Sequence, residues 1–241
     1  DGVVKEFFED GQVKTEKTYV NYKLNGSFRE YYPDGKVMSV GGYKDGLLEG
    51  PYKSYYSDGT LFMEKNYVNG LQHGQSKEFY ENGNLKSAEN YRYDNLDGLC
   101  RYFYDDGTLR YTLEFVAGQL HGDSKEYNTA GVLTSSVRYR DNELNGEARE
   151  FKENGTLYAI WNYENGQKSG PSRTFYDNGQ EEWVLLFKDG DISGPGKKFS
   201  RNGILLLEAE YLANQYNGLV KEYYETRRTK SECYYKQGQK D

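Results

Sequence analysis

The sequence contains few of the residues and motifs on which most enzyme active sites depend. Its 241 residues include only two histidines, two cysteines and two tryptophans. No Ser/His/Asp arrangement, no G-x-S-x-G motif and no phosphate-binding glycine loop is present. Carboxylates are numerous, but they are scattered over the chain. We therefore expect a protein that is not an enzyme and that needs no cofactor.

Long apolar segments and clusters of positive charge are also missing. No apolar run is long enough to cross a membrane as a helix. The net charge is −7, and the basic residues are spread along the chain. This balance disfavours binding to nucleic acid or to a membrane lipid. The chain begins with Asp1 inside a repeated segment, so it is expected to be a trimmed or mature fragment whose compartment stays open.

Glycine, by contrast, is abundant and recurs with a fixed period of 24 residues. A period of this size indicates a repeat architecture. One series is unbroken: Gly2, Gly26, Gly50, Gly74, Gly98, Gly122, Gly146, Gly170, Gly194 and Gly218. A second series begins at Gly11 and fails only in the last repeat, where Arg227 stands. The chain is therefore predicted to be one domain of ten repeats, 2–25, 26–49, 50–73, 74–97, 98–121, 122–145, 146–169, 170–193, 194–217 and 218–241.

Each repeat has the pattern of a β-hairpin, with two segments rich in Tyr, Phe, Val and Thr around an Asp-Gly or Asn-Gly pair. Pro33-Asp34-Gly35 favours a three-residue loop made of a type I turn and a left-handed glycine. With such a loop, Tyr55 faces Leu61 across the strands. The second turn, Val68-Asn69-Gly70, is expected to repeat this geometry. Both periodic aromatic series, Phe7 to Tyr223 and Tyr19 to Tyr235, would then share one face.

The predicted fold is all-β: an elongated, single-layer, antiparallel β-meander of about ten hairpins and about twenty strands, twisted or coiled. Each hairpin would contact only its neighbours. The first glycine of each repeat is expected at a kink or beneath a ring from a neighbouring strand. The periodic basic residue, from Lys5 to Lys221, is expected to lie on a ring or to pair with a carboxylate across the strands. A row of cations that binds a ligand is the alternative.

No metal site or disulfide is expected. His73 and His121 occupy the same place in repeats two apart, too far from each other to share a metal ion. Cys100 and Cys233 are more than five repeats apart and cannot form a disulfide. Each Asp-Gly or Asn-Gly turn supplies one side-chain ligand, whereas calcium takes about six to eight oxygen atoms.

One asymmetry along the chain predicts a binding surface. Two positions of each repeat lie between the leucine and the second aromatic residue. They are mostly polar in repeats one to four and nearly all apolar in repeats five to nine. An apolar stripe on a single-layer sheet must be covered or used. Sheet curvature or residues outside this chain would cover it; a partner protein or a second copy would use it. The candidate groove residues are Tyr111, Leu113, Val137, Trp161, Trp183, Leu185 and Leu207.

The repeat pattern also resembles a known family. The phrase G-x-x-x-x-Y-Y-x-D-G-x-L-x-x-x-x-x-Y-x-x-G-x-x-x-G resembles the MORN repeat, and most closely the bacterial variant labelled an antitoxin component of the YwqK type. The sequence departs from it at Asn128, which replaces the second tyrosine, and at Thr226-Arg227-Arg228-Thr229, which lacks the turn glycine. In the third repeat the match is carried by Gly50, Tyr55, Tyr56, Asp58, Gly59, Leu61, Tyr67, Gly70 and Gly74.

The resemblance implies an elongated β-meander with a scaffolding role, and the antitoxin label implies a bound toxin. The leading interpretation is a non-enzymatic scaffold that binds another protein through the groove, with a homodimer contact as a variant. A surface glycan or cell-wall binder is the first alternative, although such modules use periodic Gly-Trp and neither Trp161 nor Trp183 adjoins a glycine. A phospholipid-associated protein is the second. Bacterial cytoplasm and cell surface both stay open as the location.

Overall fold

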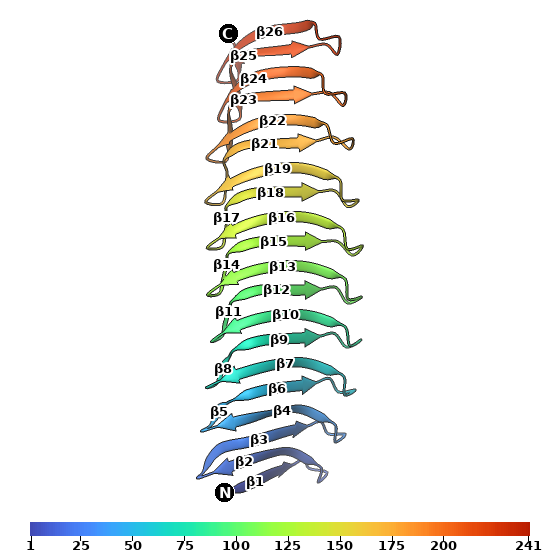
Figure 1. The fold of residues 1–241 in the computed structure, drawn as a ribbon, viewed down its shortest axis with the longest axis vertical. Helices are drawn as coiled ribbons and strands as arrows, with labels where there is room; N and C mark the ends of the chain where they lie inside the picture. Colours follow the sequence, from blue (N-terminus) through green and yellow to red (C-terminus); the bar gives the residue numbers. More distant parts are fainter. The chain divides into compact units, whose positions relative to one another are not determined.

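The structure is a computed structural model that describes residues 1–241. It consists of strands joined by turns and contains no helix (Figure 1). The residues form two compact units, an N-terminal unit of Asp1–Gln119 and a C-terminal unit of Leu120–Asp241. In each unit, successive strands along the chain pair with one another in antiparallel order. The prediction of an all-β antiparallel meander is confirmed.

The N-terminal unit contains ten long strands and the short strands between them. The long strands are β1 (Gly2–Phe7), β2 (Val13–Val20), β3 (Lys23–Tyr31), β4 (Val37–Lys44), β6 (Gly50–Tyr55), β7 (Leu61–Val68), β9 (Gly74–Phe79), β10 (Leu85–Arg92), β12 (Gly98–Phe103) and β13 (Leu109–Val116). The two-residue strands are β5 (Leu47–Leu48), β8 (Leu71–Gln72) and β11 (Asn95–Leu96), followed by β14 (Gln119–Leu120) at the end of the unit.

The C-terminal unit repeats this arrangement. Its long strands are β15 (Gly122–Tyr127), β16 (Leu133–Arg140), β18 (Gly146–Phe151), β19 (Leu157–Glu164), β21 (Gly170–Phe175), β22 (Glu181–Lys188), β23 (Asp191–Phe199), β24 (Leu205–Leu212), β25 (Gln215–Tyr223) and β26 (Thr229–Lys236). Its two-residue strands are β17 (Glu143–Leu144), β20 (Gln167–Lys168) and β27 (Gln239–Lys240).

The short strands exist because the first glycine of most repeats kinks the chain, although β3, β23 and β25 run unbroken through Gly26, Gly194 and Gly218. Gly50, for example, has a φ of 76°, a backbone region that glycine enters at low cost. Before it, Leu47 and Leu48 pair with β4 as a separate two-residue strand. After it, β6 pairs with β4 again from Lys53 onward. Of the two predicted roles for this glycine, the kink is the one that the backbone shows.

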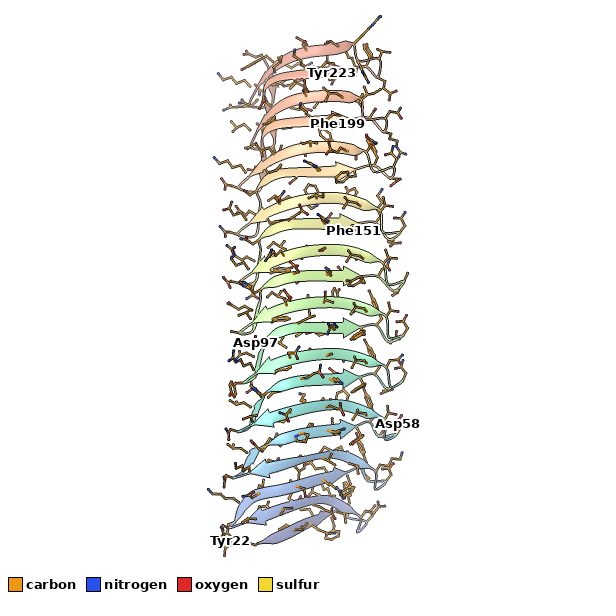
Figure 2. All side chains as sticks on the ribbon, viewed as in Figure 1. Tyr22, Asp58, Asp97, Phe151, Phe199 and Tyr223 are labelled. Atoms are coloured by element: carbon orange, nitrogen blue, oxygen red, sulfur yellow. The ribbon has the colours of Figure 1, made fainter.

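The first turn of each hairpin has the predicted three-residue loop. In the second repeat the amide of Tyr32 donates to the carbonyl of Lys36, at 2.8 Å, and the amide of Gly35 donates to the carbonyl of Tyr32, at 2.9 Å. The last repeat closes in the same way without a glycine, because Arg227 itself adopts a φ of 66°. Asp58, in one of these loops, and Tyr22, in a turn of the other kind, lie at opposite ends of the hairpins in the N-terminal unit (Figure 2).

The second turn differs from the prediction. Val68 pairs directly with Leu71, so the loop contains only Asn69 and Gly70. Both have positive φ, 51° and 81°. A two-residue loop with two left-handed residues is a type I′ turn, the form that Asn-Gly and Asp-Gly favour because its twist matches that of the strands. The expected three-residue loop at this end is therefore wrong.

A β-bulge in each hairpin decides which side chains share a face. In the third repeat Tyr55 lies opposite Leu61, but Ser54 lies opposite Met63, so Phe62 is an extra residue. An extra residue shifts the alternation of side chains by one. As a result, Tyr55 and Tyr67 lie on opposite faces of the sheet. The prediction that the two aromatic series share a face is wrong.

Numbering each repeat from its first glycine makes the two faces explicit. The inner face carries positions 3, 5, 14, 16, 18 and 23, and the outer face carries positions 2, 4, 6, 15 and 17. All buried strand residues lie on the inner face, and most are small, because larger side chains of neighbouring strands close over them. They are Thr15, Phe28, Ser39, Ser54, Gln72, Ser76, Ser87, Cys100, Ser124, Ala148, Ala159, Ser172, Thr174, Gly196, Ala209 and Val220.

Successive repeats are also joined by tyrosine hydroxyls. The Oη of the tyrosine at position 7 donates to the carbonyl at position 6 of the next repeat, as from Tyr56 to Phe79, at 2.8 Å. The same bond joins Tyr176 to Phe199, at 2.9 Å. Asn128, which replaces this tyrosine in the sixth repeat, donates its Nδ2 to the carbonyl of Glu153 instead, at 2.9 Å. The second tyrosine of the repeat therefore links one hairpin to the next.

Candidate functional site

The outer face carries a cross-strand ion pair in four of the ten repeats. The basic residue at position 4 pairs with the glutamate at position 15, as Lys5 does with Glu16 at 2.7 Å and Lys53 does with Glu64 at 2.6 Å. The Lys5 ammonium and the Tyr31 hydroxyl both donate to Glu16 and hold the pKa of its carboxyl below the usual value. These pairs confirm the predicted cross-strand partner in the four repeats where position 15 is glutamate, whereas Arg29, Lys77, Arg101 and Lys125 form no such pair.

The inner face of the N-terminal unit combines polar side chains with the ring cluster of Phe28, Tyr43, Tyr52 and Tyr67. Tyr91 donates its hydroxyl to Glu89, at 2.9 Å. Burial, together with this bond, raises the pKa of Tyr91. Cys100 is fully buried, and burial raises the pKa of its thiol, which makes the thiol unreactive. Of the predicted groove residues, Tyr111 and Leu113 belong to this unit, where they lie half-buried on β13.

The other predicted groove residues lie on the inner face of the C-terminal unit. Val137 is on β16, Trp161 on β19, Trp183 and Leu185 on β22, and Leu207 on β24. All five are half-buried. Because of the bulge, they lie on the inner face with the rings at position 18, while the rings at position 6 lie on the outer face. Small buried residues lie between them.

Trp161 is the centre of an aromatic cluster that contains a lysine. Its ring meets the ring of Phe187 edge-on, with centroids 6.1 Å apart. The Nζ of Lys168 lies 3.2 Å from the centre of the Trp161 ring and 5.4 Å from that of Phe187. Lys168 also stands directly opposite Tyr163 across β19 and β20. A cation over an aromatic face is attracted by the negative electrostatic potential that the ring quadrupole gives to that face.

Trp183 is covered in a similar way. Lys198 stands opposite it on β23, and its Nζ lies 5.1 Å from the centre of the Trp183 ring. Neither Lys168 nor Lys198 forms an ion pair, in contrast to most lysines of the outer face. Burial lowers the pKa of Lys168, and the charge of Glu150 opposes that shift only in part.

Sequence reasoning missed both lysines, although each breaks the pattern of its position. Position 23 is Leu or Ile in six repeats and is Lys168 in the seventh. Position 5 is Glu in six repeats and is Lys198 in the ninth. These substitutions could have been found by comparing the repeats one position at a time. Their contact with the tryptophans could not, because it depends on the bulge.

Three buried polar atoms beside the tryptophans have no hydrogen-bond partner. They are the Nε1 of Trp161, the Oγ of Ser172 and the Oγ1 of Thr174. Ser172 is 1% exposed and Thr174 is 8% exposed. Thr174 lies opposite Ala159 on one side and opposite Trp183 on the other. Buried polar groups without partners are costly, and four others, on Ser54, Gln72, His73 and Ser124, lie elsewhere on the sheet.

Beyond β22 the inner face is filled by packed apolar side chains. A Cβ added at Gly196 would lie 2.6 Å from the Cε2 of Tyr211 and 3.0 Å from the Cδ2 of Leu185. Leu185 and Tyr211 therefore rest on the backbone of β23, which only a glycine permits. Tyr211 continues this packing to Tyr216, with ring centroids 5.0 Å apart.

The histidines and cysteines are separate from this region. The His73 ring stacks on Tyr93, with centroids 4.6 Å apart, and the Nδ1 of His121 lies 3.4 Å from the Oδ1 of Asp141. No group of three or more His, Cys, Asp or Glu residues is placed to hold a metal ion. Both cysteines are free thiols. No helix of the structure is long and apolar enough to cross a membrane.

The period, the hairpins and the two turn types define a β-hairpin repeat protein. The sequence profile described as MORN repeat variant matches residues 1–21, 24–45, 48–69, 72–93, 96–117 and 144–165. These segments cover more than half of the chain, and the chain therefore belongs to this family. The repeats that carry Trp183, Leu185 and Leu207 lie outside the matched segments, although their hairpins have the same register.

Comparison with solved structures finds similarity to components of toxin complexes. One match is a crystal structure of TcdB2-TccC3-Cdc42, with 12% sequence identity and a TM-score of 0.22. The aligned region covers 96% of this chain and 14% of the other. Another match is a Photorhabdus luminescens Tc holotoxin pore with the mutation TccC3-D651A, with 13% sequence identity and a TM-score of 0.18. The aligned region covers 99% of this chain and 16% of the other. At such TM-scores the similarity defines neither fold nor role. No curated protein matches the sequence.

Proposed function

We propose that this protein is a non-catalytic interaction module that binds another protein through the inner face of β19, β21, β22, β23 and β24. The observation that carries the proposal is the position of both tryptophans, with Leu185 and Leu207, on one face of a sheet that has no second layer. Half-buried aromatic and aliphatic side chains around small buried ones are typical of protein interfaces. A repeat-based interaction module agrees with the MORN repeats of the chain.

Two observations favour a protein partner over the alternatives. Lys168 and Lys198 already cover the rings of Trp161 and Trp183, whereas a sugar-binding site needs open ring faces for stacking. The net charge of −7 opposes attachment to an anionic lipid surface. An antitoxin-like role, in which the partner is a toxin, is the more specific form of this proposal.

Photo-crosslinking tests the proposal in the cell that produces the protein. A photoreactive amino acid is placed at Leu185, on the inner face, and in a matched variant at Leu186, on the outer face of the same strand. We expect a specific crosslinked protein only with the inner-face probe. A crosslink to a second copy of the chain would instead identify a homodimer.

The crosslinked protein is then purified and its Kd is measured. Trp161→Ala and Trp183→Ala are each expected to weaken binding by about tenfold or more. Val184→Ala, whose side chain lies on the outer face between Arg173 and Lys197, should leave the Kd unchanged. Thermal unfolding of each variant separates lost contacts from lost folding. Equal crosslinking from both faces, or tryptophan variants that fold and bind normally, would overturn the proposal.

A further inference from the structure

The unsatisfied polar groups around the tryptophans share one chemical property. The ammonium groups of Lys168 and Lys198 have no carboxylate within ion-pair distance, and both are hydrogen-bond donors. The Nε1 of Trp161 is a donor only, and the hydroxyls of Ser172 and Thr174 can donate as well. The two ammonium groups are the donors that a ligand on this face can reach, and they select acceptors that carry negative charge.

Strand register brings these groups into two adjacent rows. One row runs across four strands from Ala159 through Thr174 and Trp183 to Lys198, each residue opposite the next. The second row contains Leu185, which lies opposite Ser172 on one side and Gly196 on the other. Trp161 follows Ala159 on the same face of β19, at the end of this second row. Lys168 lies outside both rows, opposite Tyr163, and Glu150 borders the first row opposite Ala159.

A carboxylate on this patch would change what the lysines contact. Each lysine now lies over a tryptophan ring, out of contact with any counterion. A carboxylate would draw the ammonium group into a charge-assisted hydrogen bond. The face of the tryptophan ring would then be open to contact with an apolar side chain of the ligand. A basic segment would instead bring like charge to Lys168 and Lys198, and a neutral one would leave both lysines unpaired beside buried surface.

We propose that the partner segment bound by this patch is an acidic polypeptide in which Asp or Glu side chains and apolar ones stand two residues apart. Trp161 and Trp183 take the apolar side chains, and Lys168 and Lys198 take the carboxylates. This inference rests on the proposed function, since it names the chemistry of the protein that the inner face binds. An extended segment suits the patch, because every second side chain faces the same side, about 6.6 Å apart, which is also the spacing of the two rows along each strand beneath it.

A displayed library of short random peptides tests the inference with the complete chain. Peptides are selected on the wild-type protein after depletion on Trp161→Ala, so that only inner-face binders remain. Trp183→Ala serves for depletion if Trp161→Ala unfolds. The selected peptides are then measured against Lys168→Met and Lys198→Met, which keep an apolar stem. Lys197→Met is the matched control, because it removes the same charge from the outer face next to Lys198.

We expect the selected peptides to be rich in Asp, Glu and apolar residues, and each inner-face lysine variant to weaken them by about tenfold. The Lys197 control should bind as the wild type does. Selected peptides that are basic or neutral would overturn the acidic partner while the protein-binding function stands. Failure to select any peptide that depends on the tryptophans would overturn both. Lysine-dependent binding of phosphatidylcholine–phosphatidylserine vesicles, without acidic peptides, would replace the partner protein by a membrane surface.

Discussion

The ammonium group of Lys168 lies 3.2 Å from the centre of the Trp161 ring, on the inner face of the C-terminal unit. The contact explains how a large aromatic side chain is kept on a single-layer sheet in water. The ammonium group itself lies over the ring and between it and that of Phe187. The same device covers Trp183 with Lys198. The apolar stripe is therefore closed by movable side chains rather than by a second layer of structure.

Replacing Lys168 with methionine should stabilise the protein near neutral pH. Burial holds the pKa of Lys168 below its value of 10.5 in the unfolded chain. Folding therefore disfavours the charged form, and this cost is present at every pH below the folded-state pKa. It is relieved as the pH rises from that pKa toward 10.5. Lys168→Met should raise the thermal midpoint at pH 7, and its advantage should shrink in alkaline solution.

Lys188→Met is the control for this variant, since Lys188 is exposed and its removal changes the net charge equally. It should leave the midpoint nearly unchanged. A lower midpoint for Lys168→Met at pH 7 would show instead that the attraction between the ammonium and the rings outweighs the cost of burial.

The outer-face pair of Lys197 and Glu208 should stabilise the protein in neutral but not in acidic solution. Lys197 first, and then the hydroxyl of Tyr223, hold the pKa of Glu208 below its usual value of 4.5. This stability is present above the unfolded-state pKa and is lost as the pH falls through the folded-state pKa. Glu208→Gln should cost no more than about 1 kcal/mol at pH 7, because the pair is exposed. Glu210→Gln, at a residue without an ion pair, is the control.

Urea unfolding at several pH values measures this difference. The gap between the wild type and Glu208→Gln should close as the pH falls below about 4, the usual range of a carboxyl group. A gap that stays constant into strong acid would mean that Glu208 acts through packing and not through its charge.

Removing one hydroxyl between repeats should weaken the N-terminal unit. The Oη of Tyr56 donates to the carbonyl of Phe79, at 2.8 Å. Tyr56→Phe leaves that carbonyl without the bond and should lower the free energy of unfolding by about 1 kcal/mol. Tyr55→Phe is a matched control on the neighbouring residue, whose hydroxyl forms no hydrogen bond. Equal urea midpoints for the two variants would mean that the hydroxyl does not help to join the repeats.

Restoring the turn glycine of the last repeat should stabilise it. Arg227 has a φ of 66°, which costs a residue with a side chain about 1–2 kcal/mol relative to glycine. Part of the gain is lost because glycine is more flexible in the unfolded chain. Arg227→Gly should therefore raise the free energy of unfolding by up to about 1 kcal/mol. Arg228→Gly, one residue on and outside the left-handed region, should lower it. Hydrogen exchange at Tyr224 reports the local effect.

The sequence allowed the repeat, the hairpins and the first turn to be predicted because each depends on local chemistry. Asp34 and Gly35 select a type I turn with a left-handed glycine in any surroundings. The second turn could also have been predicted, since Asn69-Gly70 is a typical type I′ pair. It was missed because one loop length was assumed for both ends of the hairpin.

The sequence by itself determined the period, the strand segments and the stripe of residues that includes Trp161, Trp183 and Leu185, since these follow from residue types at fixed spacing. Only the tertiary structure decided what the stripe faces. One bulged residue in each hairpin moves the first aromatic series to the outer face, and a bulge depends on pairing between strands rather than on a pattern along one strand. The same pairing sets Lys198 against Trp183 and brings Lys168 over Trp161. Which side chains meet across two strands depends on the register of the strands. That register cannot be determined from the pattern of residues along one strand.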